Sequence, residues 1–150
     1  MRVVIQRVKR ASVGVGGVQV GAIRHGLLVF LGIEETDANE DVLWLVQKIT
    51  QMRIFSDTEG KMNLDLMQAR GQILVVSQFT LHASTKKGNR PSFIRAARPE
   101  AAMPLYKLFL ETCRKINGLY VQEGQFGAMM DIDLINDGPV TICMDSKAKE

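Results

Sequence analysis

The chain has 150 residues, of which 46% are hydrophobic and 23% are charged, and its formal net charge is +3. This length buries a core in one domain, residues 1–150, and the composition excludes a disordered or fibrous chain. Two cysteines without ligand or disulfide spacing, and charges inside the first apolar run, favour a reducing, cytoplasmic setting without a signal peptide or membrane span.

The first third of the chain has the patterns of β-strands. Residues 3–8 alternate as a strand does, which places Arg7 on the same face as two aliphatic side chains. Arg7 is either a snorkelling edge residue or a guanidinium fixed beneath a functional site. Residues 12–23, "SVGVGGVQVGAI", predict two short strands joined by a Gly16-Gly17 turn, and residues 26–33 predict a buried central strand.

Two helices are predicted on either side of a second buried strand, "GQILVVSQFTL" at 71–81. Asp37 and Glu40 resemble a capping box that opens the first helix. Pro99 is a plausible first residue of the second helix, and Gly118 is a suitable stop. The spacing of apolar positions predicts that this second helix buries Leu105, Leu108, Phe109, Thr112 and Ile116.

The last part of the chain predicts strands near 119–123, 128–135 and 139–145. Asp137-Gly138 is typical of a hairpin turn, and Pro139 would then stand at the first residue of the final strand. The alternative is that the Gly-Pro unit is a rigid part of an active site. The elements together predict a single α/β (α+β) domain with a mixed or mainly antiparallel sheet and two main helices.

Polar side chains gather where the second buried strand ends. Ser77, Gln78, Phe79 and Thr80 stand at this strand end, and strand alternation would direct Ser77 and Phe79 away from Gln78 and Thr80 unless a bulge intervenes. Two hydroxyls and an amide can donate hydrogen bonds to a developing oxyanion, but none of them is a base. A structural hydrogen-bonding role is the simpler interpretation of such a cluster.

Candidates for a base, a nucleophile or a metal ligand are few. His25 lies in a tight turn, and no pattern ties His82 to the polar cluster. Cys143 is a weak candidate for a reactive thiol. The sequence has no cluster of metal ligands and no glycine-rich phosphate loop, so we expect no metal and no cofactor.

A basic connection follows the polar cluster directly. Such a run of charge is most often a solvated surface, but next to the polar strand end it would suit a phosphate-rich substrate. The basic residues in this connection are Lys86, Lys87, Arg90, Arg95 and Arg98.

Three motifs resemble those of the D-aminoacyl-tRNA deacylases, first described as D-tyrosyl-tRNA deacylases. They are "SQFTL" at 77–81, "KGNRPSF" at 87–93 and "NDGPVT" at 136–141, in the order and spacing of that family. The resemblance covers essentially the whole chain. Two positions depart from the family pattern: His82 replaces a common tyrosine, and Pro104 is unusual in the second helix.

The resemblance implies a homodimer of a compact α/β fold with barrel-like sheets and no cofactor. It implies hydrolysis of the ester that joins a D-amino acid to the terminal ribose of tRNA, with glycyl-tRNA also accepted. The residues at 77–80 would be catalytic, either through Thr80 as nucleophile or through the ribose 2′-OH, with N–H groups near Phe79 as an oxyanion hole.

The same resemblance implies the substrate-binding residues. Gly138-Pro139 would be cis, would reach into the pocket of the other subunit and would hold the substrate's ammonium group with its carbonyls. An L side chain would then meet backbone and be excluded. Arg7 would support the Gly-Pro turn, His82 would line the pocket, and Lys86, Lys87 and Arg90 would meet the tRNA.

Two rival functions stay open on the sequence. One is an RNA-binding module without turnover, which is weakened by the small number of aromatic side chains available for base stacking. The other is a general esterase with a Ser77 or Thr80 nucleophile.

Overall fold

The computed structural model describes residues 1–149, which contain two helices, a short 3-10 turn and eight strands. The helices are α1 (Asn39–Gln51) and α2 (Pro99–Arg114), and the 3-10 turn is η1 (Phe79–His82). The strands are β1 (Arg2–Val15), β2 (Val18–Ile23), β3 (Gly26–Gly32), β4 (Phe55–Ser56), β5 (Met62–Leu64), β6 (Gln72–Ser77), β7 (Val121–Glu123) and β8 (Asp131–Asp145).

Six of the strands form one mixed, nearly closed barrel-like sheet. Their order is β2-β1-β3-β6-β7, and β8 pairs with β1. The β3–β6 and β6–β7 pairs are parallel, whereas β1 is antiparallel to each of its partners. The predicted α/β domain with a mixed sheet and two main helices is therefore confirmed.

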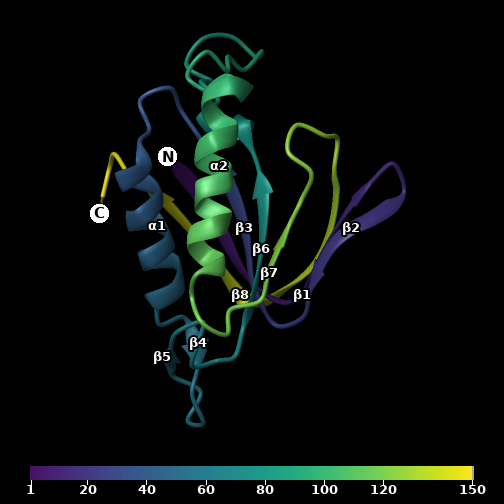
Figure 1. The fold of residues 1–150 in the computed structure, drawn as a ribbon, viewed down its shortest axis with the longest axis vertical. Coiled ribbons are helices and arrows are strands. Elements are labelled where there is room, and N and C mark those ends of the chain that lie inside the picture. Colours follow the sequence, from purple (N-terminus) through teal and green to yellow (C-terminus); the bar gives the residue numbers. More distant parts are fainter. Residues whose placement is uncertain (150) are drawn as a thin grey trace.

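Both faces of the central strands are covered. The two helices lie side by side against one face of the sheet (Figure 1), and the larger apolar cluster fills the space between the two layers. A smaller cluster lies on the opposite face, inside the curl of the sheet, and includes Val8, Leu28 and Leu74. Burial on both faces explains why β3 and β6 are continuous apolar runs without polar alternation.

β1 joins two segments that the sequence patterns suggested as separate strands. Its first half pairs with β3, from Arg2 opposite Gly32 to Val8 opposite Gly26. Its second half pairs with β2 through the predicted turn at Gly16 and Gly17, where φ is 57° and 81°. These positive φ values are the reason that glycine is suited to both turn positions.

The observed capping box of the first helix lies one residue later than the predicted one. The N-cap is Ala38, whose N–H donates to Asp41 Oδ2 at 2.9 Å, so Asp41 has the role predicted for Glu40. Asp37 instead accepts a hydrogen bond from the N–H of Glu34 at 2.8 Å. The prediction was wrong by one position, because Glu40 and Asp41 can each serve as the N3 carboxylate of a capping box. The conformation of the loop that enters the helix decides which of the two has this role.

The second helix starts at Pro99 as predicted but ends at Arg114, before Gly118. Its buried face is also rotated relative to the prediction, because the helix packs on β6, where the Tyr106 hydroxyl donates to the Val75 oxygen at 3.1 Å. Phe109 is buried as predicted, and Leu105, Leu108, Thr112 and Ile116 are only partly buried. The fully buried positions are Ala102, Tyr106, Phe109, Leu110 and Cys113.

The predicted hairpin at 137–138 is wrong, because β8 is one long strand. Both of its halves pair with β1, and the register passes from Gln6 opposite Thr141 to Val8 opposite Asn136. Arg7 alone therefore faces residues 137–140, which form a bulge in β8. The Gly138-Pro139 peptide bond in this bulge is cis. Within residues 1–149, neither helix is long and apolar enough to cross a membrane.

Candidate active site

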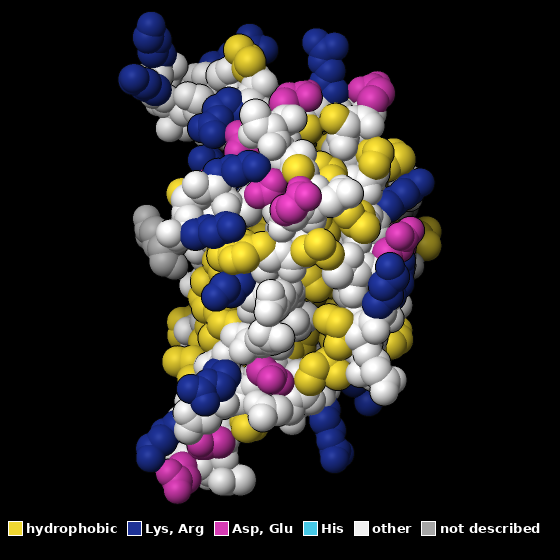
Figure 2. All heavy atoms as spheres, turned by 60° about the vertical axis from the view of Figure 1, so that its left-hand side comes forward, with side chains coloured by type: hydrophobic (Ala, Val, Ile, Leu, Met, Phe, Trp, Pro, Cys, Tyr) yellow, Lys and Arg dark blue, Asp and Glu magenta, His cyan; other side chains and the backbone are white. Residues whose placement is uncertain are grey.

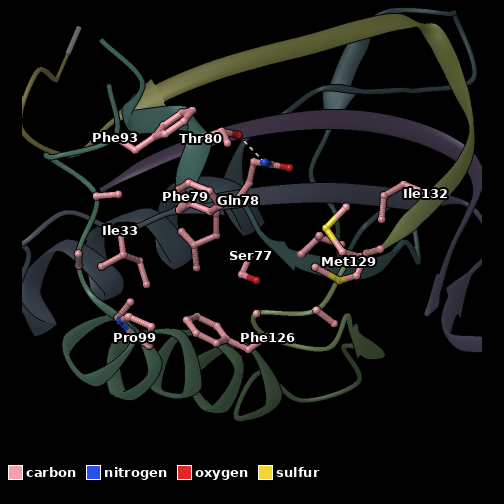
Figure 3. Close-up of a pocket in the computed structure, with 18 residues that line it drawn as sticks. Ile33, Ser77, Gln78, Phe79, Thr80, Phe93, Pro99, Phe126, Met129 and Ile132 are labelled. Atoms are coloured by element: carbon pink, nitrogen blue, oxygen red, sulfur yellow. Dashed lines mark hydrogen bonds between the residues drawn. The ribbon is translucent and has the colours of Figure 1, made fainter. Parts of the chain in front are cut away.

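The four residues at 77–80 line one cavity of about 690 Å³. The cavity lies where β6 ends and η1 begins, and it is closed by the start of α2, the loop before β8, and Ile132 of β8 (Figure 3). Ser77 lies in the middle of the cavity in this view. The structure thus brings together all the residues that the sequence singled out at the end of the second buried strand.

The chain changes from strand to 3-10 turn within these four residues. The β6 ladder ends when the Gln78 N–H donates to the Leu31 oxygen at 2.8 Å, and the Leu81 N–H then closes the turn on the Gln78 oxygen at 3.2 Å. Alternation stops at this point, because a 3-10 turn repeats every three residues. All four residues line the same cavity, and the Gln78 and Thr80 side chains stay together, joined by a hydrogen bond.

The turn η1 offers hydrogen-bond donors rather than a base. Because Phe79 and Thr80 open η1, the geometry of the turn leaves their N–H groups without an acceptor inside it. The Gln78 Nε2 group donates to Thr80 Oγ1, which fixes the amide and the hydroxyl relative to one another. This arrangement can stabilise negative charge on an oxygen placed in the cavity.

The lining of the cavity contains no ionisable side chain among the described residues. Apart from the polar groups at 77–80, it is made of apolar and small residues: Leu31, Ile33, Val76, Phe93, Ala96, Ala97, Pro99, Ala102, Phe126, Gly127, Ala128, Met129, Met130 and Ile132. The cavity therefore provides neither a general base nor a carboxylate that could bind an ammonium group.

The rim of the cavity is apolar and exposed. Phe79 and Phe93 meet edge to face, with ring centroids 5.2 Å apart and an interplanar angle of 74°. Phe79 is 56% exposed and Met129 is 92% exposed. Sequence reasoning missed Phe93, Phe126 and Met129, because these residues lie in loops with no periodic pattern and reach the cavity only through tertiary packing, such as that of Phe93 on Phe79.

His82 does not line the cavity, contrary to the expectation for a pocket wall. It is 1% exposed, and its ring packs against Gly32, where an added Cβ would lie 3.2 Å from the imidazole Cδ2. Neither ring nitrogen has a hydrogen-bond partner among the described residues. Burial lowers the pKa of His82, so the ring is neutral at neutral pH.

Of the two alternatives for Arg7, the structure shows the buried guanidinium and not the snorkelling edge residue. It is 8% exposed, and it donates from Nε to the Asp137 oxygen at 3.1 Å and from Nη1 to the Ile54 oxygen at 2.5 Å. It therefore supports the β8 bulge from below. A Cβ on Gly138, whose φ is 125°, would lie 2.7 Å from Arg7 Nη2.

Gly138 and Pro139 do not reach the cavity of their own chain. Both are exposed, and the bulge that carries them borders a smaller cleft of about 330 Å³ lined in part by Arg7, His25 and Asp137. The cavity at 77–80 and the Gly-Pro unit are thus two separate features of one chain.

The basic connection stands out from the body of the protein beside the cavity. Lys86, Lys87 and Arg90 lie in an excursion closed by backbone hydrogen bonds between Ser84 and Ser92. All three are exposed, and none forms an ion pair within the described part of the chain. Figure 2 shows Lys and Arg side chains gathered at the end of the molecule where this loop stands in Figure 1.

Other basic residues of the connection are tied to the fold. Arg95 pairs with Glu34 at 3.0 Å, and the backbone N–H of Arg98 donates to Glu35 Oε1 at 2.9 Å. Because Phe93 in the same segment lines the cavity, these contacts anchor the basic loop directly at its mouth. No group of three or more His, Cys, Asp or Glu side chains in residues 1–149 is placed to hold a metal ion.

The comparisons with known proteins agree on one family. Residues 4–145 match the family model described as D-Tyr-tRNA(Tyr) deacylase. The chain is 61% identical to the D-aminoacyl-tRNA deacylase of Akkermansia muciniphila and 55% identical to that of Bacteroides fragilis, over the full length of each protein.

Two solved structures have the same fold. The chain superposes on the c-Myc DNA Unwinding Element Binding Protein with a TM-score of 0.93 and 44% identity, over 99% of this chain and 100% of that one. A probable eukaryotic D-amino acid tRNA deacylase superposes with a TM-score of 0.78 and 20% identity, over 95% and 97% of the two chains.

Proposed function

The chain belongs to the D-Tyr-tRNA(Tyr) deacylase family, and on that premise we propose that it hydrolyses D-aminoacyl-tRNA, and glycyl-tRNA as well, while it rejects L-aminoacyl esters. It is a hydrolase of the D-aminoacyl-tRNA deacylase class, and its substrate is a charged tRNA.

One observation carries the mechanism: the cavity at 77–80 has hydrogen-bond donors but no ionisable side chain among its described lining residues. A serine or threonine nucleophile needs an adjacent base to remove its proton. Thr80 Oγ1 instead accepts a hydrogen bond from Gln78. This arrangement favours hydrolysis assisted by the substrate over an acyl-enzyme formed on Ser77 or Thr80.

In the proposed reaction, the acyl carbonyl oxygen lies against the N–H groups at the start of η1. The oxygen of the attacking water bonds to the acyl carbon while the ribose 2′-OH accepts a proton from that water and passes its own proton toward the ribose 3′ oxygen. The bond from that carbon to the ribose 3′ oxygen then breaks, and the leaving oxygen takes up the proton. The Phe79 N–H stabilises the negative charge that develops on the carbonyl oxygen. An aminoacyl ester is already activated, so this assistance is sufficient.

Stereoselection requires a group that binds the ammonium, and the cavity has no carboxylate for this purpose. We assign the ammonium to the carbonyls of Gly138 and Pro139 from a second copy of the chain. Their exposed position, outside their own cavity, supports this arrangement. With the ammonium and the acyl carbonyl both fixed, an L side chain points into backbone and a D side chain points into open space. Glycine has no side chain to exclude, so glycyl esters pass.

The tRNA phosphates are assigned to the basic loop. Lys86, Lys87 and Arg90 are exposed and free of ion pairs within the described residues, and their loop is anchored at the cavity mouth. A non-catalytic RNA-binding module would also use these cations. The RNA-binding alternative does not explain why one cavity contains the N–H groups, the amide and the hydroxyls of residues 77–80.

The deciding experiment measures hydrolysis of D-tyrosyl-tRNA and L-tyrosyl-tRNA side by side with the purified protein. We expect rapid loss of the D ester and near-background loss of the L ester. Equal rates would remove stereoselection from the proposal, and tight binding without turnover would favour the RNA-binding module. Turnover of small aryl esters through a trappable acyl-enzyme would favour the general esterase.

The cross-subunit arrangement has its own test in mixed dimers. We call the exposed Gly138-Pro139 unit the tip. Gly138→Ala disables the tip, and Ala96→Trp fills the cavity from a half-buried position in its wall. If each site uses the cavity of one chain and the tip of the other, an equal mixture of the two inactive variants recovers up to about a quarter of the wild-type activity. Two inactive variants that stay inactive when mixed would place both elements in one chain.

A further inference from the structure

The bulge that carries Gly138 and Pro139 has lost its ladder hydrogen bonds to β1. Between the Gln6–Thr141 and Val8–Asn136 pairs, Arg7 is the one β1 residue that faces residues 137–140. The backbone groups in such a bulge must find other partners or face water. The structure shows which side chains replace the missing ladder.

Asn136 closes the bulge from its own strand. Its Oδ1 accepts the N–H of Val140 at 3.0 Å, and its Nδ2 donates to Thr141 Oγ1 at 3.0 Å. The same Thr141 oxygen accepts Gln6 Nε2 at 3.3 Å, which ties the bulge to β1. One asparagine side chain therefore spans the two ends of the loop that carries Gly138 and Pro139.

These contacts complement the contact made by Arg7. Arg7 is buried and reaches the Asp137 oxygen, on the N-terminal side of Gly138. Asn136 and Thr141 hold Val140 and the return to the ladder, on the C-terminal side of Pro139. The tip is thus fixed at both ends by side chains, whereas its own two residues are exposed and make no ladder contact.

We propose that Asn136 and Thr141 are positioning residues that set the selectivity between D and L esters. This inference rests on the proposed function, in which the Gly138 and Pro139 carbonyls fix the ammonium. Exclusion of an L side chain by clash requires the clamp to hold its place, because a tip that moves lets the substrate shift away from the clash. Loss of the Asn136 and Thr141 hydrogen bonds therefore harms the discrimination between D and L esters more than it harms folding.

The variants are Asn136→Ala, Thr141→Val and Thr141→Ser. The first removes both asparagine hydrogen bonds, and the second removes the hydroxyl that accepts from Asn136 and Gln6. Thr141→Ser keeps that hydroxyl and is the conservative rescue. Asp133→Asn is the matched control, because Asp133 is an exposed residue of the same strand whose partner is Arg10, away from the bulge.

The first readout is the ratio of kcat/KM for D-tyrosyl-tRNA to that for L-tyrosyl-tRNA. We expect this ratio to fall about tenfold in Asn136→Ala and in Thr141→Val, the loss that corresponds to about one hydrogen bond. It should keep its wild-type value in Thr141→Ser and Asp133→Asn. A ratio that stays at the wild-type value in Asn136→Ala and Thr141→Val would overturn the inference, as would equal losses on both esters accompanied by a lower Tm.

The second readout does not depend on catalysis. The Val140 amide should exchange its hydrogen at least about tenfold faster in Asn136→Ala than in the wild type, because its acceptor is gone. Unchanged exchange would show that Asn136 does not hold the tip. If the wild type hydrolyses both esters equally, the proposed function fails. The Val140 exchange rate still decides whether Asn136 holds the Gly138-Pro139 unit in place.

Discussion

Arg7 on β1 donates from Nε to the backbone oxygen of Asp137 on β8 at 3.1 Å, directly below the exposed Gly138-Pro139 unit. This contact joins the first strand of the chain to the last strand, between residues 130 positions apart. Arg7 also donates to the Ile54 oxygen, so one buried guanidinium connects the bulge to the loop between α1 and β4. Arg7 therefore supports the Gly138-Pro139 unit on its N-terminal side, as Asn136 and Thr141 do on its C-terminal side.

Replacing Arg7 by lysine should remove the support of the Gly138-Pro139 unit while it keeps the positive charge. An ammonium group cannot form the forked contacts to the Ile54 and Asp137 oxygens, and one buried carbonyl is then left unpaired. We expect the free energy of unfolding to fall by about 1–3 kcal/mol. We expect kcat/KM on D-tyrosyl-tRNA to fall by about a hundredfold, because a small displacement of a positioning group has that effect. Denaturant unfolding and steady-state kinetics measure the two effects, and wild-type kinetics would show that Arg7 has only a structural role.

Adding a methyl group at Gly138 should separate the tip from its support. The new Cβ would lie 2.7 Å from Arg7 Nη2 at a φ of 125°, which L side chains rarely adopt. Gly138→Ala should therefore lose most D-ester turnover while its far-UV circular dichroism stays native. The control is Gly60→Ala, which has a φ of 80° but nothing within 4 Å of the added atom. Equal loss of activity in both variants would assign the effect to backbone strain in general.

The proton in the reaction should be handled by the substrate and not by Thr80. We expect Thr80→Val to retain catalysis within about a hundredfold of wild type, because the hydroxyl only helps to place the acyl group. A D-aminoacyl-tRNA whose terminal ribose has no 2′-OH should be cleaved at near-background rate by the wild-type protein. Single-turnover assays on the two substrates make the comparison. Rapid cleavage of the 2′-deoxy substrate together with an inactive Thr80→Val variant would assign the step to the threonine.

Reversing the charge of Lys86 and Lys87 should weaken binding of tRNA and leave the chemical step intact. The double variant Lys86→Glu/Lys87→Glu should raise KM and reduce the salt dependence of kcat/KM, because fewer counterions are released on binding. The matched control is Lys107→Glu/Lys115→Glu, the same charge change at two exposed positions along and just after α2. An equal rise of KM in both double variants would reflect net charge and not the loop.

The buried His82 should make the protein less stable in acid. Burial lowers the pKa of His82 in the folded state, so the unfolded chain binds the proton more readily. The free energy of unfolding should therefore fall as the pH drops below about 6.5, the ordinary value for histidine. His82→Phe should remove this dependence and stabilise the protein by about 1 kcal/mol, since it removes unpartnered polar atoms. Denaturant unfolding of both proteins at pH 7.5 and 5.5 gives the comparison, and a parallel fall in both would exclude His82.

Much of the architecture follows from local patterns. The continuous apolar runs at 26–33 and 71–81 predicted buried central strands, Gly16-Gly17 predicted the turn after β1, and Pro99 predicted the start of α2. These features depend on side-chain periodicity and on the φ preferences of glycine and proline, which are properties of the residues themselves. The motif at 77–81 likewise predicted that polar groups would meet at the end of a strand.

Tertiary structure decided the remaining features. Asp137-Gly138 has the chemistry of a hairpin turn, yet both flanking segments bind the same partner strand, so the unit is a bulge opposite Arg7. His82 is the last residue of η1, yet it packs into the fold against Gly32 and does not line the cavity, whose remaining wall comes largely from loop residues. Local propensity determines which conformations a segment can adopt, but the choice among them depends on which distant strand takes up its hydrogen bonds and which space its side chains fill.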